Sequence, residues 1–182
     1  MLSQSIGWCG KLPIQADFIQ SNRFSNIEKN IMDWIIKGQN HLGEKLVKMN
    51  DSYIVNFYYF SNKNFSEEGK FVRGVLFNSR DQRGRICPFV MFCVDEKAPL
   101  KEIFLIFFQK LNDFKFKFSL LNSLLIDDQI FTNLMEAVPT LDLNGRILEP
   151  MDYWVELYPT FSGLELKVEK TNHIVYRKLM LK

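Results

Sequence analysis

The charged residues with the most suggestive spacing lie in one short stretch near the middle of the chain. Arg80, Asp81, Arg83 and Arg85 fall within six consecutive positions, and Arg73 precedes them. Guanidinium groups bind carboxylates and phosphates through paired hydrogen bonds, so arginines gathered around one turn could hold an anionic ligand or partner. Asp81 could instead fix the turn, by pairing with Arg85 or by accepting backbone N–H groups. Both interpretations can hold together, because a rigid turn is a good platform for a partner contact.

Other patterns typical of catalytic or metal sites are missing from the sequence. Its two histidines, His41 and His173, are far apart, and neither lies in a His-Glu-x-x-His arrangement. We therefore expect both at the surface and no metal site. No Gly-x-Ser-x-Gly segment, Walker loop or dinucleotide-binding glycine pattern occurs. The sequence predicts no cofactor and no enzyme; the alternative is an enzymatic or ligand-responsive switch that uses the Arg-rich hairpin with Asp17 or Asp81.

The alternation of Phe and Lys over residues 114–118 raises a second chemical possibility, the binding of single-stranded nucleic acid by stacking and phosphate contacts. Two observations argue against it. Helical spacing buries part of this Phe set, and the formal charge of +2, from 23 basic and 21 acidic residues, supplies no supporting basic field. We expect no nucleic-acid partner.

Composition favours a single domain that stays in the cytoplasm. The chain has 182 residues, of which 47% are hydrophobic, enough for one core over residues 1–182. The three cysteines lack metal-type spacing and are expected to be reduced, mostly buried thiols. No secretory signal is visible, and the most apolar run, Ile103 to Leu111, is shorter than the roughly 20 residues that span a bilayer. We therefore expect no membrane insertion.

The elements that must position the charged residues begin with an extended segment and a helix. Ile6 to Ile14 carries two Gly and one Pro and is typical of an extended segment or edge strand. A helix is predicted from Ile27, capped by Ser25 or Asn26 and weakened in its middle by its glycines. Its apolar stripe consists of Ile27, Ile31, Trp34, Ile35, Leu42 and Leu46, and its outward residues are Glu28, Lys29, Lys37 and Lys45.

Three antiparallel strands are predicted next, at Ser52 to Phe60, Phe71 to Phe77 and Ile86 to Val94, because these runs are dense in aromatic and β-branched residues. The second and third are joined by a turn at residues 81–84, where Gly84 can take a positive φ. The charged stretch therefore lies at the tip of a hairpin.

The rest of the chain predicts two helices followed by four strands. The helices start at Pro99 and at about Asp128, the second ending at Pro139. The strands are Arg146 to Leu148, Tyr153 to Tyr158, Leu164 to Val168 and Ile174 to Leu179. The predicted fold class is α+β: a mainly antiparallel sheet with helices packed on it, as a single compact domain.

Two segments carry longer motifs. The first runs Gly7-Trp8-Cys9-Gly10-Lys11-Leu12-Pro13 and on to Asp17-Phe18; the second runs Gly74-Val75-Leu76 through Ser79-Arg80-Asp81 to Gly84-Arg85 and Pro88. In content, order and separation they resemble the motifs of the TagF family of type VI secretion accessory proteins. The chain departs from the commoner family pattern at Ala16, where Gly is frequent, and at Gln82, where Arg is frequent.

The resemblance implies a non-enzymatic cytoplasmic regulator that represses type VI secretion post-translationally, by engaging a forkhead-associated scaffold protein of the apparatus. The candidate partner-binding or motif residues are Trp8, Lys11, Asp17, Phe18, Asp81, Arg83 and Arg85. The candidates for shaping the backbone are Gly7, Gly10, Pro13, Gly74, Gly84 and Pro88.

Two alternatives to this binding role stay open at this point. In the first, Asp17 and Asp81 are buried capping groups, and both motifs are signatures of the fold alone. In the second, the chain is a structural protein that forms a homo-oligomer through exposed Phe side chains on the helix after Pro99, since large exposed apolar patches usually mark contacts.

Overall fold

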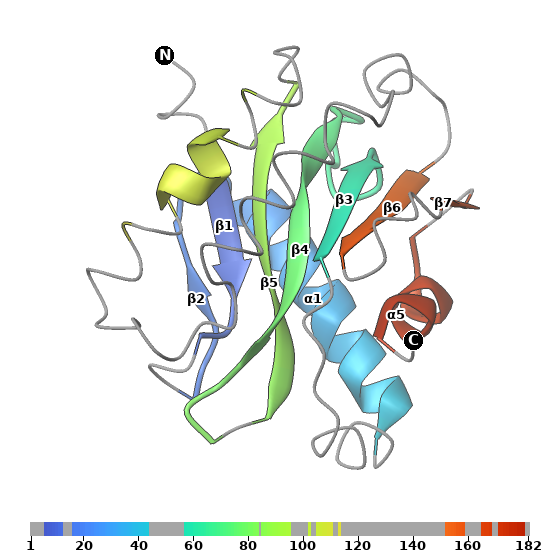
Figure 1. The fold of residues 1–182 in the computed structure, drawn as a ribbon. Helices are drawn as coiled ribbons and strands as arrows, with labels where there is room; N and C mark the ends of the chain where they lie inside the picture. The colour runs from blue at the N-terminus through green and yellow to red at the C-terminus, as the bar shows by residue number, and fades with distance from the viewer. Residues whose placement is uncertain are drawn as a thin grey trace.

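The structure of the protein, a computed structural model, describes residues 6–12, 16–43, 57–83, 85–95, 102, 105–110, 113, 152–158, 165–168 and 171–180 (Figure 1). Its strands are β1 (Gly7–Gly10), β2 (Ile19–Gln20), β3 (Phe57–Asn62), β4 (Val72–Arg80), β5 (Ile86–Val94), β6 (Asp152–Tyr158) and β7 (Glu165–Val168). Its helices are α1 (Ser25–Leu42) and α5 (His173–Met180), and residues 105–110 are helical as well.

The strands form one antiparallel sheet in the order β2-β1-β5-β4-β3-β6-β7. The predicted α+β class with a mainly antiparallel sheet is confirmed, as are the strands at β4, β5, β6 and β7. β3 runs two residues beyond its predicted end, and its predicted start lies outside the described residues. The predicted extended segment is confirmed as β1, but β1 is not an edge strand, because it pairs with β2 on one side and with β5 on the other.

The main core lies between one face of the sheet and the two helices, which lie side by side against it (Figure 1). Trp34 of α1 is at its centre. Its ring stacks on Trp154 of β6 with centroids 5.4 Å apart and meets the edge of Tyr176 of α5 at 5.2 Å. Side chains that alternate with the core residues, such as Tyr59 and Met91, are also buried, so the central strands are covered on both faces.

The start of α1 differs from the prediction. Neither Ser25 nor Asn26 caps the helix; the N-cap position is the preceding Phe, which makes no side-chain cap. The Glu28 carboxylate instead holds the segment that leads into the helix. It accepts hydrogen bonds from the Ser21 hydroxyl and from the backbone N–H groups of residues 22–24, with N–O distances of 3.0 to 3.4 Å for the three amides. Glu28 was expected on the outer face of the helix, but it is fully buried, because those hydrogen-bond donors satisfy its carboxylate inside the protein.

The apolar stripe of α1 is buried as predicted over the described residues; Lys45 and Leu46 lie outside them. The helix continues through Gly38, where a break was possible, and ends at Leu42. Gly38 is the point at which α5 crosses closely: a Cβ there would lie 2.2 Å from the Tyr176 ring. Its small size therefore allows the two helices to touch.

The segment Ile174 to Leu179 is a helix, so the predicted strand there is wrong. Asn172 caps this helix: its side-chain oxygen accepts hydrogen bonds from the N–H groups of Ile174 and Val175 at 2.9 and 3.3 Å. The buried residues follow a helical period rather than alternating. β-branched and aromatic residues misled the propensity argument because packing against α1 overrides such preferences. The buried residues are Val175, Tyr176, Leu179 and Met180.

Several predictions lie outside the described residues: the helix from Asp128, the strand at 146–148, and most of the helix after Pro99. The part of that last helix that is described includes Phe107 and Phe108, and both are buried. The homo-oligomer alternative would need such Phe side chains to be exposed. Within the described part of the chain, no helix is both long and apolar enough to cross a membrane. All three cysteines are free and buried, as predicted.

Candidate functional site

The pairing of β1 with β5 brings the two sequence motifs together. Gly10 lies opposite Phe89, and the next residue, Lys11, donates its backbone N–H to the Pro88 carbonyl at 3.4 Å. Gly10 has a φ of +137°, and a Cβ there would lie 2.4 Å from that carbonyl oxygen. Only glycine allows this approach. A Cβ at Gly74 would likewise lie 2.3 Å from the carbonyl oxygen of Met91, so this motif glycine also allows close strand packing.

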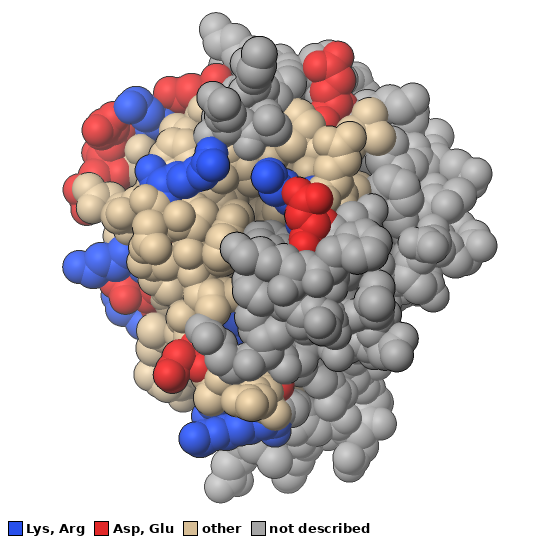
Figure 2. All heavy atoms as spheres, turned by 90° about the vertical axis from the view of Figure 1, so that its left-hand side faces the viewer, with Lys and Arg blue, Asp and Glu red and all other residues tan. Residues whose placement is uncertain are grey.

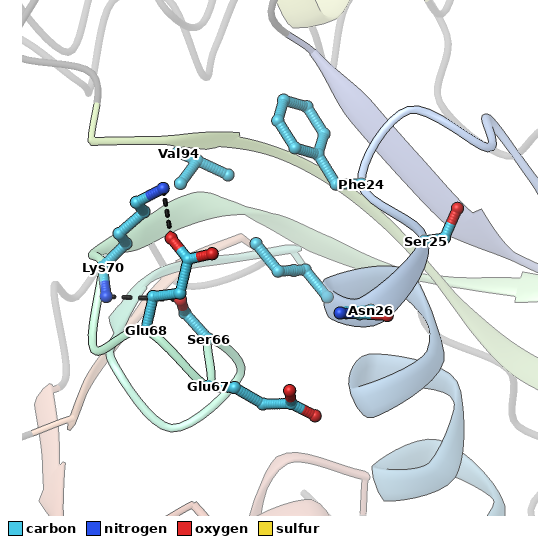
Figure 3. Close-up of a pocket in the computed structure, with 9 residues that line it drawn as sticks. Phe24, Ser25, Asn26, Ser66, Glu67, Glu68, Lys70 and Val94 are labelled. Atoms are coloured by element: carbon cyan, nitrogen blue, oxygen red, sulfur yellow. Dashed lines mark hydrogen bonds and ion pairs between the residues drawn. The ribbon is translucent and has the colours of Figure 1, made fainter.

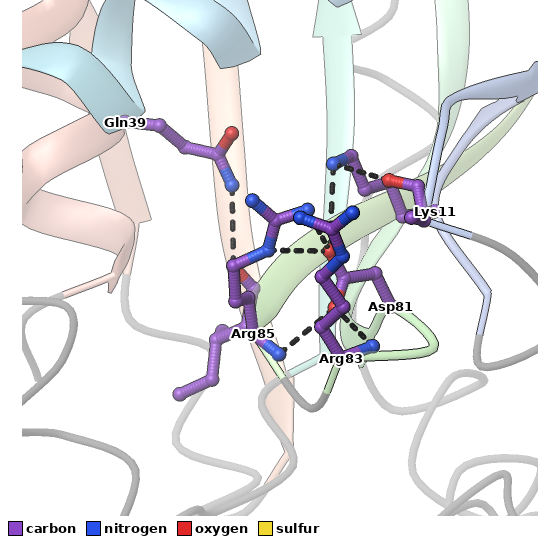
Figure 4. A network of polar contacts seen from close by, with 7 residues as sticks. Lys11, Gln39, Asp81, Arg83 and Arg85 are labelled. Carbon is purple, nitrogen blue, oxygen red and sulfur yellow. Dashed lines mark hydrogen bonds and ion pairs between the residues drawn. The ribbon is translucent and has the colours of Figure 1, made fainter.

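Asp81 is the centre of the cluster that results (Figure 4). Its side chain is fully enclosed, and Oδ1 accepts the backbone N–H groups of Arg83 and Arg85 at 2.9 and 3.0 Å. Oδ2 accepts Nε of Arg85 at 2.7 Å and lies 2.6 Å from its Nη2. Both parts of the turn-fixing interpretation are therefore confirmed. Burial alone would raise the pKa of Asp81, but the hydrogen bonds from Arg85 and from the backbone outweigh it and hold the pKa below its usual value.

Lys11 ties the first motif to this carboxylate. Its Nζ lies 3.5 Å from Oδ2 of Asp81, donates to the backbone carbonyl of Ala16 at 2.8 Å, and sits 5.0 Å above the centre of the Phe18 ring. The side chain is only 12% exposed. Because the acceptor is a backbone carbonyl, the hydrogen bond from Lys11 to position 16 does not depend on which residue occupies that position. Asp17 follows with an exposed side chain.

The arginines do not all join the cluster. Arg83 and Arg85 are exposed at the turn, but Arg73 lies towards the far end of β4, opposite Cys93, and is fully buried. Its Nε donates to the hydroxyl of Tyr59 at 3.0 Å. The expected gathering of four arginines around the turn is wrong in this respect, because a nine-residue strand carries Arg73 away from the tip. The Arg80 side chain lies outside the described part.

Trp8 stands apart from the charged residues. Its ring stacks on Phe89 with centroids 6.1 Å apart, and its backbone carbonyl accepts the N–H of Ser21 at 2.9 Å, which ties β1 to the segment after β2. Trp8 thus belongs to the sheet that carries the cluster. Pro13 and Gly84 lie outside the described residues, and Pro88 is buried in β5 opposite Asn78.

Sequence reasoning missed Gln39, which joins α1 to the cluster. Its Nε2 donates to the carbonyl of Ile86 at 3.1 Å, next to Arg85 (Figure 4). The sequence pattern does not indicate a role for Gln39, because it lies at the border of the apolar stripe of α1. Cys87 lies close by, and burial raises the pKa of its thiol to about 12 while Lys11 lowers it in part. A thiol with that pKa is protonated at neutral pH and is a poor nucleophile.

Two hollows lie away from the cluster. One, of about 350 Å³, opens beside the start of α1 and is bordered by Ser25, Asn26 and the loop that carries Glu68 and Lys70, which form an exposed ion pair (Figure 3). The other, of about 400 Å³, lies between α1, the loop after β3 and the start of α5. Neither is bordered by Asp81 or its partners.

The described residues contain no group of three His, Cys, Asp or Glu side chains placed to hold a metal ion. His41 and His173 are exposed, as expected. Their rings lie side by side with centroids 4.5 Å apart, which the sequence separation of the two residues did not reveal.

The architecture defines the class of protein first: an α+β domain with an antiparallel sheet. A crystal structure of PA0076 from Pseudomonas aeruginosa PAO1 shares this fold, with a TM-score of 0.62 and 17% identity over 98% of this chain and 95% of that chain. The family model for the TagF N-terminal domain, type VI secretion system-associated, matches residues 7–136, which include both motifs. The chain belongs to this family. No curated protein sequence is significantly similar to it.

Proposed function

We propose that this chain is a non-enzymatic cytoplasmic accessory protein that represses type VI secretion post-translationally by binding a protein of the apparatus, a forkhead-associated scaffold. Membership of a type VI secretion-associated family supports a role in type VI secretion. The observation that carries the binding role is the meeting of the two motifs in one cluster, with its carboxylate inside and its guanidinium groups outside.

The geometry of the cluster favours recognition over chemistry. The contacts of Asp81 with Arg83 and Arg85 hold the turn in place, and the contact with Lys11 joins the turn to the first motif. Its lowered pKa keeps Asp81 ionised, so it is a weak proton acceptor. The neighbouring Cys87 thiol is protonated. What remains for a partner is the rigid turn itself, with Arg83 and Arg85 on its surface.

The alternatives receive less support. An enzymatic or ligand-responsive switch that used Asp81 would need that carboxylate to be accessible, but it is enclosed by Lys11, Arg85 and two backbone N–H groups. Asp17, the other carboxylate of this alternative, is exposed, and no described side-chain contact gives it a catalytic partner. A homo-oligomer through the helix after Pro99 would need exposed Phe side chains, and the two described ones are buried.

The test is affinity capture of the tagged chain from its host under conditions that repress secretion. The informative variant is Arg83→Ala, because only the backbone N–H of Arg83 contributes to the Asp81 network. Lys29→Ala is the matched control, since Lys29 is an exposed cation on α1, away from the turn. We expect the wild type and Lys29→Ala to recover the forkhead-associated scaffold and Arg83→Ala to recover much less.

Two results would count against the proposal in different ways. Equal recovery of the scaffold by all three proteins would place the binding surface elsewhere on the molecule. Recovery of no secretion component by the wild type would remove the regulatory function itself. Circular dichroism of each variant confirms beforehand that it is folded.

A further inference from the structure

The charged cluster has an inner and an outer layer. Lys11 and Asp81 form the inner layer, with side chains 12% and 0% exposed. The outer layer consists of Arg85, whose side chain is 55% exposed, and the exposed Arg83. Asp17 is also exposed and lies between Ala16 and Phe18, which both contact Lys11. Among the described residues, a partner that approaches the turn therefore meets two guanidinium groups and the nearby Asp17 carboxylate, while the Asp81 carboxylate is out of reach.

Lys11 has a particular effect on this arrangement. If Asp81 faced Arg85 alone, the pair would be neutral as seen from outside. Because the same Oδ2 atom also faces Lys11 at 3.5 Å, the three groups keep a net positive charge. Figure 2 shows Lys and Arg residues at the lower end of the face that it presents, at the height at which the turn between β4 and β5 lies in Figure 1.

The two guanidinium groups are also held differently. Asp81 binds Nε and Nη2 of Arg85, which orients that side chain, and its Nη1 has no partner within the described part of the chain. Arg83 is fixed through its backbone N–H, and its guanidinium has no partner among the described residues. Pre-orienting a charged side chain lowers the entropy lost on binding.

We infer that this end of the molecule binds an acidic segment of its protein partner, with Arg83 and Arg85 as the anion-binding side chains. The inference rests on the proposed function and specifies the chemistry of the partner. Guanidinium groups bind oxyanions in a paired geometry, and carboxylate and phosphate groups share that chemistry. Asp17, at the edge of the same cluster, repels an acidic segment and sets an upper limit on its affinity.

The experiment measures fluorescence polarisation of labelled peptides with the full chain. The probes are hexaglutamate, hexaglutamine, and a hexaglutamine peptide that carries one phosphothreonine. We expect hexaglutamate to bind more tightly than hexaglutamine, and Arg83→Glu to weaken that binding by about tenfold. Lys29→Glu, with the same change of charge on α1, is expected to leave it nearly unchanged. Asp17→Asn is expected to strengthen it about threefold.

The inference is overturned if neither hexaglutamate nor the phosphothreonine peptide binds more tightly than hexaglutamine, or if Arg83→Glu and Lys29→Glu have equal effects. Tighter binding of the phosphothreonine peptide than of hexaglutamate would support the anion site and identify phosphate as the anionic group that it prefers. The proposed function fails separately. If the peptides bind but no secretion component is captured, the anion site is supported and the proposed function is not. If capture depends on Arg83 but no peptide binds, the proposed function is supported and the anion site is not.

Discussion

At the residue scale, the most consequential group is the Asp81 carboxylate, which holds together two sequence motifs that the chain separates by more than fifty residues. It accepts hydrogen bonds from Arg83 and Arg85 and faces Lys11. Removing a carboxylate of this kind leaves its partners with unmatched charge and with unsatisfied backbone donors. The exposure of Arg85 reduces the cost, because water can solvate its guanidinium.

We predict that Asp81→Asn lowers the free energy of unfolding by about 2 kcal/mol at pH 7, and that this loss shrinks in acid. The pKa of Asp81 is lowered in the fold. Its contribution is therefore fully present above the unfolded value of about 4 and disappears as pH falls through the folded value. Urea unfolding of both proteins at pH 7, 4 and 3 measures the difference.

The matched control for this substitution is Asp33→Asn, because Asp33 is an exposed carboxylate on α1. It should change stability by less than about 0.5 kcal/mol at each pH. A destabilisation by Asp81→Asn that stayed constant from pH 7 to 3 would show that the carboxylate acts through shape and not through charge.

Glu28 illustrates a different principle at the residue scale: a carboxylate within a helix can hold the segment that leads into that helix. Its carboxylate satisfies the backbone donors of residues 22–24. We predict that Glu28→Gln lowers the free energy of unfolding by about 1 to 3 kcal/mol, because an amide nitrogen cannot accept those hydrogen bonds. Ser25→Ala should change it by less than about 0.5 kcal/mol. Thermal unfolding compares the two, and a larger effect at Ser25 would restore the side-chain cap expected from sequence.

At the element scale, the contact between α1 and α5 is decided at Gly38, which has the Tyr176 ring directly against its Cα. The two helices contact each other more closely than they could if the residue at position 38 had a side chain. Two effects of a substitution at Gly38 therefore oppose one another. A Cβ raises helix propensity by about 1 kcal/mol, while overpacking costs about 1 to 3 kcal/mol.

We predict that Gly38→Ala destabilises the protein by about 1 to 2 kcal/mol, with overpacking the larger effect because the clash is with a buried ring. Asn40→Ala is the control, since Asn40 is exposed on the same helix and its replacement raises propensity without a clash. Urea unfolding should show opposite signs for the two variants. Stabilisation by Gly38→Ala would mean that α5 can shift away at little cost.

At the scale of the whole molecule, the central strands of the sheet are buried on both faces, and the reactivity of their thiols measures that burial. Cys9, Cys87 and Cys93 are at most 2% exposed, and burial raises the pKa of Cys9 and Cys87. We predict that fewer than one thiol reacts with Ellman's reagent in the native protein and that all three react in guanidinium chloride. Rapid reaction of a native thiol would show that one of these strands opens without global unfolding.

The sequence by itself determined the features that depend on near neighbours. The stripe of Ile27, Ile31 and Trp34 specifies α1 through its period, and the aromatic and β-branched runs specify β4 and β5. The turn at Asp81 follows from its own side chain and the residues just after it. The family could be recognised because its motifs are contiguous in the chain.

Only the tertiary structure decided which of these elements meet. The pairing of β1 with β5 places Lys11 beside Asp81, and the length of β4 carries Arg73 out of the cluster. The burial of Glu28 was equally beyond local reasoning, and packing against α1 decided the helical state of α5 over its β-branched and aromatic residues. Hydrophobic periodicity and turn chemistry act over a few residues, whereas strand order, burial of a charge and close helix contact depend on surfaces that come together only when the chain folds.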